Sequence, residues 1–170
     1  MAIVFKFRML SDESDHFVRE YEVPYDMTLA AFHDFIRETL EYEEAMVSFY
    51  TADDRWEKVR EFTLMDMGTG DDSENAPIPM SEVTLNGILH HLHDRLIYQF
   101  DLLSNRAFYL ELTAVEKAAP GAVYPREFFA HGSAPDQFDP EATVKDESIF
   151  DEMMDEFDGF DGDDSYDDEY

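Results

Sequence analysis

The chain has 170 residues, with 41 acidic and 12 basic side chains and a net charge of -29 at pH 7. Such a field repels the phosphates of nucleic acids, so it opposes direct nucleic-acid binding and favours a basic protein partner. The composition is 44% hydrophobic and 15% aromatic, which suits a folded core. Because the chain has no cysteine, disulfides and thiolate chemistry are excluded.

The start of the chain does not resemble an export signal. The first residues lack a charged region followed by a long apolar run, so they do not read as a signal peptide. No apolar stretch approaches the roughly 20 residues that are needed to span a bilayer. We therefore expect a cytoplasmic protein that does not contact membranes.

The first part of the chain shows the alternation that is typical of strands. Apolar residues at every second position predict strands over 3–10 and 17–23, and the polar turn 11–15 between them predicts a hairpin. Pro24 should end the second strand, because proline cannot donate to a sheet ladder.

The period then changes to that of a helix. An apolar stripe with Asp26 or Thr28 as the N-cap predicts a helix, and the stripe consists of Leu29, Phe32, Ile36 and Leu40. His33 lies beside this stripe, where we expect a partly buried, hydrogen-bonded histidine rather than a ligand or a base. A third strand is predicted over 46–50 and a fourth over 56–64. Trp56 should cover the sheet edge, with ligand stacking as the alternative.

A loop over 68–79 separates these elements from a second predicted helix. Ser81 or Thr84 caps this helix, whose apolar stripe is Leu85, Ile88, Leu89 and Leu92. His90, His91 and His93 would lie near its C-terminal end, where the helix dipole favours histidine. His90 and His93 are one turn apart and could share a metal, but the spacing supplies no third ligand. We predict neither a metal nor a cofactor.

A second hairpin follows, with strands over 96–101 and 106–115 around a turn at Ser104-Asn105. Its apolar residues alternate in register on the two strands. Asp101 and Arg106 flank the turn closely enough to pair across the hairpin. We expect this pair to be exposed and to contribute about 0.2–1 kcal/mol.

This hairpin carries a family resemblance. The run from Tyr98 through Phe100 and Asp101 to Arg106 resembles the signature of the plasmid pRiA ORF-3-like family, whose members include TnpR-like passengers of mobile elements. The order of the upstream segments is also similar, so the resemblance covers about residues 3–117. In this chain the glycine and the second aspartate of the signature are replaced.

The resemblance implies an α+β fold. Its front half, hairpin–helix–strand, would be similar to a β-grasp arrangement, followed by the second helix and the second hairpin. The resemblance implies no reaction, because the resolvase-like label reflects a genomic association. A serine recombinase would also need a basic DNA-binding module, which this acidic chain lacks.

After Lys117 the strand pattern ends, and the segment up to Thr143 mixes prolines with aromatic residues. We expect these aromatic residues to fold back onto the domain. We predict a single α+β domain over 1–145 and an acidic, aromatic-rich tail over 146–170, which holds 13 acidic residues. An amphipathic helix is indicated in the tail by the spacing of Phe150, Met153, Met154 and Phe157. It would fold on a partner or dock on its own domain, and both alternatives stay open. The tail does not fit a calcium-binding EF-hand loop.

These observations favour a non-catalytic interaction protein that binds a basic protein, with a nucleic-acid mimic as one version. The predicted partner-binding residues are Tyr98, Asp101 and Arg106 in the hairpin and Phe150, Met153, Met154 and Phe157 in the tail. The alternative is an enzyme of unknown substrate that uses carboxylates and histidine, with or without a metal. Its candidate groups are Asp101, His33 and the His90–His93 group.

Overall fold

The structure, a computed structural model, describes residues 2–65 and 76–138. A compact unit runs from Met1 to Gln137, and residues from Phe138 onward form a second unit. The predicted boundary at Lys145 and the tail residues Phe150, Met153, Met154 and Phe157 therefore lie outside the described part of the chain. Within that part, no helix has the length and apolar character that crossing a bilayer requires.

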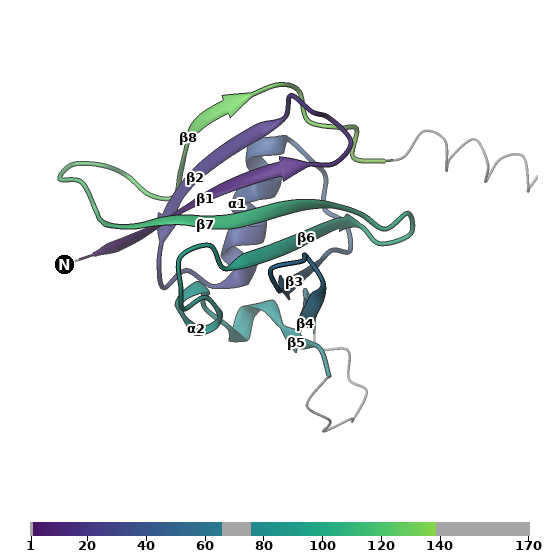
Figure 1. The fold of residues 1–170 in the computed structure, drawn as a ribbon, viewed down its shortest axis with the longest axis horizontal. Coiled ribbons are helices and arrows are strands. Elements are labelled where there is room, and N and C mark those ends of the chain that lie inside the picture. The colour runs from purple at the N-terminus through teal and green to yellow at the C-terminus, as the bar shows by residue number, and fades with distance from the viewer. Residues whose placement is uncertain (1, 66–75, 139–170) are drawn as a thin grey trace, which may run out of the picture. The chain divides into compact units, whose positions relative to one another are not determined.

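The first unit is a mixed α+β structure built on one eight-stranded sheet, as Figure 1 shows. The strand order is β5-β4-β3-β6-β7-β1-β2-β8. All neighbours are antiparallel except β4 and β5, which are parallel. The strands are β1 (Ile3–Ser11), β2 (Val18–Pro24), β3 (Ser48–Ala52), β4 (Lys58–Thr63), β5 (Ile78–Pro79), β6 (Arg95–Asp101), β7 (Arg106–Lys117) and β8 (Arg126–His131).

The predicted front half is confirmed in its order of elements. β1 and β2 form an antiparallel hairpin, and α1 (Leu29–Leu40) follows before β3. Thr28 caps α1, because its Oγ1 accepts a hydrogen bond from the backbone N–H of Ala31 at 3.1 Å. The helix ends at Leu40, and its C-cap Glu41 has a left-handed backbone with φ 59°.

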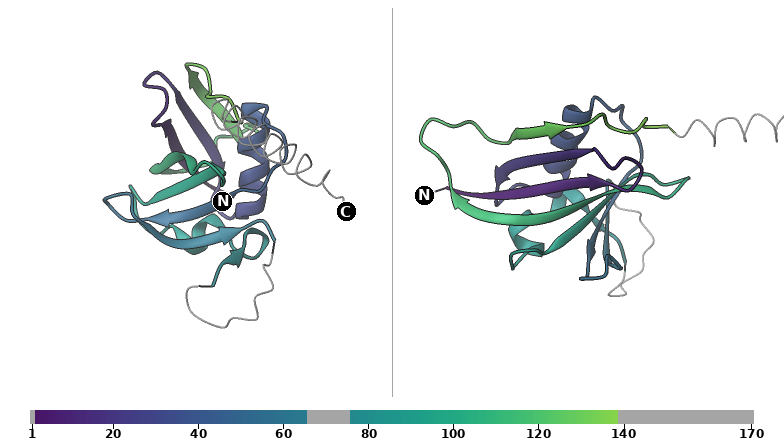
Figure 2. Two further views of the ribbon diagram at one scale, coloured as in Figure 1. Left: turned by 90° about the vertical axis from the view of Figure 1, so that its right-hand side faces the viewer. Right: turned by 45° about the horizontal axis from the view of Figure 1, so that its top comes forward.

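The core lies between α1 and one face of the sheet, and two views in Figure 2 show the helix beside that face. Phe32 of α1 packs on Phe7 of β1, with ring centroids 5.1 Å apart, and on Phe49 of β3 at 5.8 Å. Alternate residues of β1 and β2 face away from the helix and form ion pairs such as Arg8–Glu20. The period-two pattern therefore separates a core face from a polar face.

The second predicted helix is wrong in its length. α2 covers only Leu85–Ile88, after a single 3₁₀ turn, η1 (Met80–Glu82). The carboxylate of Asp94 accepts hydrogen bonds from the backbone N–H groups of His90 and His91, so the chain turns instead of continuing the helix. Leu92 is consequently exposed, and the histidines lie beyond the helix rather than on it.

The region after β7 contains a strand that the sequence pattern did not predict. β8 pairs antiparallel with β2 at one end of the sheet, so this region does fold back onto the domain. Its aromatic residues are less covered than expected, since Phe128 is 40% and Phe129 48% exposed. β8 is the last strand at this end of the sheet, so among the described residues it has a neighbouring strand on one side.

Candidate interaction site on the second hairpin

The turn between β6 and β7 is closed by its own side chains. The Asp101 carboxylate accepts a hydrogen bond from the backbone N–H of Ser104 at 3.2 Å. The Gln99 amide contacts the side-chain oxygen of Asn105 at 2.7 Å, and Asn105 has a left-handed backbone with φ 56°. Asparagine and aspartate favour such turns because their short side chains bond nearby backbone groups. The sequence pattern predicted this hairpin, and β6 and β7 confirm it.

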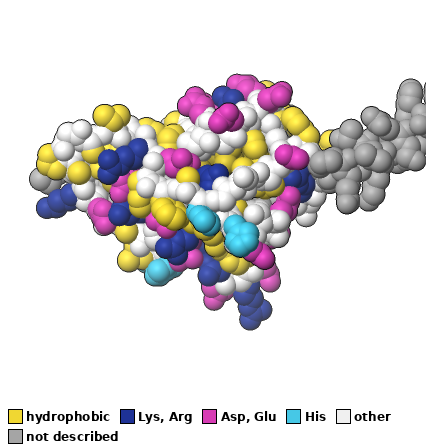
Figure 3. Space-filling model, turned by 90° about the horizontal axis from the view of Figure 1, so that it is seen from above, with side chains coloured by type: hydrophobic (Ala, Val, Ile, Leu, Met, Phe, Trp, Pro, Cys, Tyr) yellow, Lys and Arg dark blue, Asp and Glu magenta, His cyan; other side chains and the backbone are white. Residues whose placement is uncertain are grey.

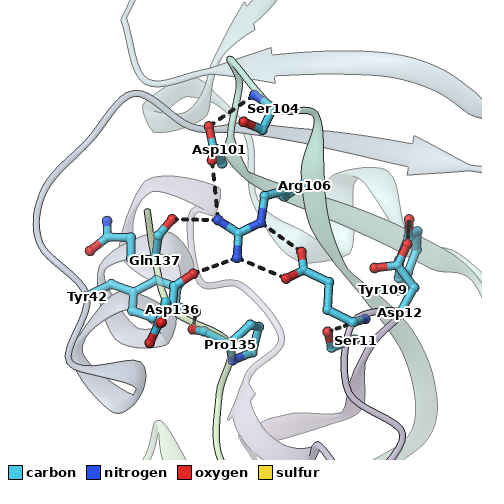
Figure 4. Close-up of polar contacts among 11 residues, drawn as sticks. Ser11, Asp12, Tyr42, Asp101, Ser104, Arg106, Tyr109, Pro135, Asp136 and Gln137 are labelled. Carbon is cyan, nitrogen blue, oxygen red and sulfur yellow. Dashed lines mark hydrogen bonds and ion pairs between the residues drawn. The ribbon is translucent and has the colours of Figure 1, made fainter. Parts of the chain in front are cut away.

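Arg106 is the centre of a network at the base of this turn (Figure 4). Its Nε and Nη2 donate to the two carboxylate oxygens of Glu13, at 2.8 and 2.9 Å. Its Nη1 lies 3.4 Å from the Asp101 carboxylate. Nη1 and Nη2 also donate to the backbone carbonyls of Gln137 and Asp136, at 3.1 and 2.6 Å. We call these five residues the Arg106 clamp.

The predicted Asp101–Arg106 pair therefore exists, but the expectation that it is exposed is wrong. The Arg106 side chain is 11% exposed and that of Asp101 is 15% exposed. The hydrogen bonds to Glu13 raise the pKa of Arg106, so the guanidinium stays charged. The planar guanidinium donates from one edge to both oxygens of the Glu13 carboxylate, and the single ammonium group of a lysine could not form this pair of parallel hydrogen bonds. Sequence reasoning missed Glu13, because no spacing rule links a residue of the first turn to the second hairpin.

The clamp also fixes the end of the first unit. The backbone of Glu43 exchanges two hydrogen bonds of 2.7 Å with the side-chain amide of Gln137. The Tyr42 hydroxyl donates to the backbone carbonyl of Pro135. Residues 135–137 are thus held from one side by Arg106 and from the other by residues 42–43.

Tyr98, the third predicted hairpin residue, lies in the core. It is 1% exposed, and its hydroxyl lies 2.7 Å from Nδ1 of His33, which is itself 4% exposed. Burial raises the pKa of the Tyr98 hydroxyl and lowers the pKa of the His33 imidazole. Both groups are therefore neutral at pH 7 and bonded to each other. The expectation of a buried, hydrogen-bonded His33 is confirmed.

The other titratable candidates lie in separate networks. His93 Nδ1 is 2.6 Å from the Glu111 carboxylate, whereas His90 and His91 flank the Asp94 turn. Asp101 is engaged by Arg106, and His33 by Tyr98. Across residues 2–65 and 76–138, no group of three histidine, aspartate or glutamate side chains is placed to hold a metal ion.

Trp56 covers a face of the sheet rather than its edge. Its ring meets Tyr109 of β7 edge-on at 5.3 Å, and the Arg95 guanidinium lies 4.5 Å from the Trp56 ring centre. A pocket of about 180 Å³ nearby in the chain is lined by Tyr50, Lys58, Val59, Arg60 and Glu61. This volume is below the roughly 300 Å³ of the smallest usual ligand sites, so the pocket does not indicate a small-molecule site.

Many of the basic side chains are already neutralised within the chain. Ion pairs with glutamate or aspartate hold Lys6, Arg8, Arg19, Arg37, Arg106 and Arg126. Figure 3 shows acidic and basic side chains interspersed on one face, with hydrophobic side chains exposed between them. Because the acidic residues outnumber the basic ones so strongly, the excess carboxylates have no cationic partner in the chain.

The family model for plasmid pRiA4b ORF-3-like proteins matches residues 3–164. The chain belongs to this family. The match extends past residue 117, where the resemblance in the sequence ends, and includes most of the tail. No curated protein matches the chain.

A solved structure is also similar. It is a protein of unknown function from Methanosarcina mazei Go1, with a TM-score of 0.62 and 14% sequence identity. The alignment covers 76% of this chain and 70% of that one. At this identity the likeness shows the fold alone.

Proposed function

We propose that the protein is a non-catalytic interaction module that binds a basic protein partner. The observation that carries this proposal is the net charge of -29, together with the intramolecular pairing of much of the basic side-chain complement. Carboxylates without a cation in the chain attract a cationic surface, and such attraction raises the rate of encounter as well as selectivity.

In this proposal the second hairpin keeps the binding surface in shape. All N–H groups of the Arg106 guanidinium already point at acceptors of the chain, and Tyr98 is buried. We infer that Tyr98, Asp101 and Arg106 hold the binding surface in shape rather than contact the partner themselves. This inference explains why the residues that carry the family signature lie in the core and at the base of the turn.

The tail supplies the second part of the proposal. Its acidic residues alternate with the anchors Phe150, Met153, Met154 and Phe157, a composition that suits folding on a partner. Asp136 and Gln137, whose backbone carbonyls Arg106 binds, precede the tail in the sequence. A cationic groove with apolar subsites would fit these anchors.

An acidic surface could imitate nucleic acid toward a DNA-binding protein, which would make the partner one whose own ligand is a polyanion. The likeness of the front half to a β-grasp arrangement stays a prediction. The alternative of a carboxylate and histidine enzyme would have to use groups that now bond elsewhere, such as His33 with Tyr98.

A capture experiment tests the proposal. The full chain and a version ending at Lys145 are used as baits in cell lysate at about 0.15 M salt. We expect a basic protein on the full-length bait. Its loss from the shortened bait would assign the contact to the tail, and its retention would assign it to the first unit. Capture of no protein by either bait would contradict the proposed function.

A further inference from the structure

The tip of the second hairpin exposes two leucines. Leu102 is 39% and Leu103 is 98% exposed, so Leu103 has almost no contact with the rest of the chain. Isolated apolar residues on a surface are common, but a fully exposed leucine at the end of a rigid turn is presented for contact.

The turn beneath these leucines is rigid. Ser104 and Asn105, which follow them, are bonded to the side chains of Asp101 and Gln99. Arg106 then anchors the hairpin to the first turn through Glu13. A contact residue that is already held in its binding conformation loses little conformational entropy on association, which favours affinity.

Acidic residues surround the base of the tip. Arg106 there contacts the carboxylates of Glu13 and Asp101 and donates to the backbone carbonyl of Asp136, and Asp12 adjoins Glu13 in the chain. Lys58 is a second cation there, with its Nζ 3.3 Å from the side-chain oxygen of Gln99. The acidic residues Asp12, Glu13, Asp101 and Asp136 still outnumber these two cations, so the surroundings of the leucines are negative. An anionic lipid surface would be repelled by this charge, whereas a protein pocket with basic residues at its rim would be attracted.

We propose that Leu102 and Leu103 form a hydrophobic anchor that inserts into an apolar pocket, rimmed by lysine or arginine, on the protein partner. The proposal rests on the proposed function and names the contact that the first unit makes. Burial of a leucine side chain at the centre of an interface removes apolar area from water, and the acidic base of the tip pairs with the basic rim.

Photocrosslinking tests the anchor. A photoreactive benzoylphenylalanine is placed at position 103 and, as the control, at position 123, where Val123 is 79% exposed on another part of the unit. The full-length chain is irradiated in lysate, and the crosslinked peptides are sequenced. We expect position 103, and not position 123, to crosslink to apolar residues that lie near lysine or arginine in one protein.

The crosslinked protein is then purified, and its affinity for the full chain is measured with Leu103→Ser and Val123→Ser. We expect Leu103→Ser to weaken binding by about 10-fold to 100-fold and Val123→Ser to leave it unchanged. Because Leu103 is 98% exposed, its replacement should not alter thermal stability, which a melting curve verifies.

Other outcomes would overturn the anchor. Binding that depends on salt but is the same for both variants would reject the anchor and keep the proposed function. Crosslinks to no protein from either position would reject the anchor, whereas the proposed function would be contradicted by the capture of no protein on the full-length bait. Sedimentation of the chain with vesicles of phosphatidylcholine and phosphatidylglycerol, lost in Leu103→Ser, would assign the leucines to a membrane instead.

Discussion

Arg106 binds Glu13 through two parallel hydrogen bonds of 2.8 and 2.9 Å, although the residues are 93 positions apart in the chain. The contact joins the turn after β1 to the start of β7. Since Arg106 also holds the carbonyls of Asp136 and Gln137, one guanidinium connects the two hairpins and the end of the first unit.

Replacement of Arg106 by lysine should destabilise the first unit by about 1–3 kcal/mol. Lysine keeps the charge but cannot bond both oxygens of Glu13 and two backbone carbonyls at once. Urea unfolding followed by circular dichroism measures the change. Arg8→Lys is the matched control, because Arg8 is 52% exposed and makes a single contact with Glu20. Equal costs for the two variants would show that the clamp adds no stability.

Tyr98→Phe should cost about 1–3 kcal/mol, because it leaves the buried Nδ1 of His33 without its partner while keeping the ring. Tyr109→Phe removes a longer contact, 3.3 Å to Asp12, on the exposed side of the sheet, and should cost about 0.5 kcal/mol or less. Denaturant midpoints of the two variants give the comparison. A neutral Tyr98→Phe would mean that His33 finds another partner.

His33 should make stability depend on pH below neutrality. Its pKa is lowered by burial in the folded state, so the unfolded chain takes up a proton first as the pH falls through about 6.5. Stability from this group is therefore present above that pH and is lost between the unfolded and the folded pKa. His33→Gln should show a smaller loss than the natural chain over this window in thermal melts. If the melting temperatures of His33→Gln and the natural chain fell by the same amount over this pH range, the account of His33 would be contradicted.

Gly132 should tolerate alanine less well than Gly121. Both have left-handed backbones, with φ +76° and +78°, which cost an alanine about 1–2 kcal/mol. A Cβ at Gly132 would also lie 2.3 Å from the carbonyl oxygen of His16, whereas a Cβ at Gly121 would have no heavy atom of another described residue within 4 Å. Thermal unfolding should thus show a larger loss for Gly132→Ala. An equal loss would mean that the segment after β8 moves away from His16 at no cost.

The sequence could predict the elements whose pattern is local. β1, β2, α1 and the β6–β7 hairpin follow from apolar periodicity and from residues such as Thr28 and Asn105. α2 was overextended because its apolar stripe continues past the point where Asp94 turns the chain. β8 was missed because its pairing depends on β2, which lies far upstream.

The candidate site was predicted only in part for the same reason. Asp101 and Arg106 lie close in the chain, so their pairing could be read from the hairpin. The burial of that pair depends on Glu13 and on residues 136–137, which tertiary structure alone brings together. Tyr98 is predicted to bind a partner, although it lies on the same strand face as Leu96 and Phe100, and all three side chains are buried.

The binding of the captured partner at two salt concentrations tests the central claim most directly. The dissociation constant of the purified pair is measured at about 0.15 M and about 1 M sodium chloride, over which the Debye length falls from about 8 to 3 Å. If the protein acts through its acidic surface, the partner is basic and its affinity falls strongly at the higher concentration. An affinity that is unchanged by salt, or a partner as acidic as this chain, would contradict the proposal.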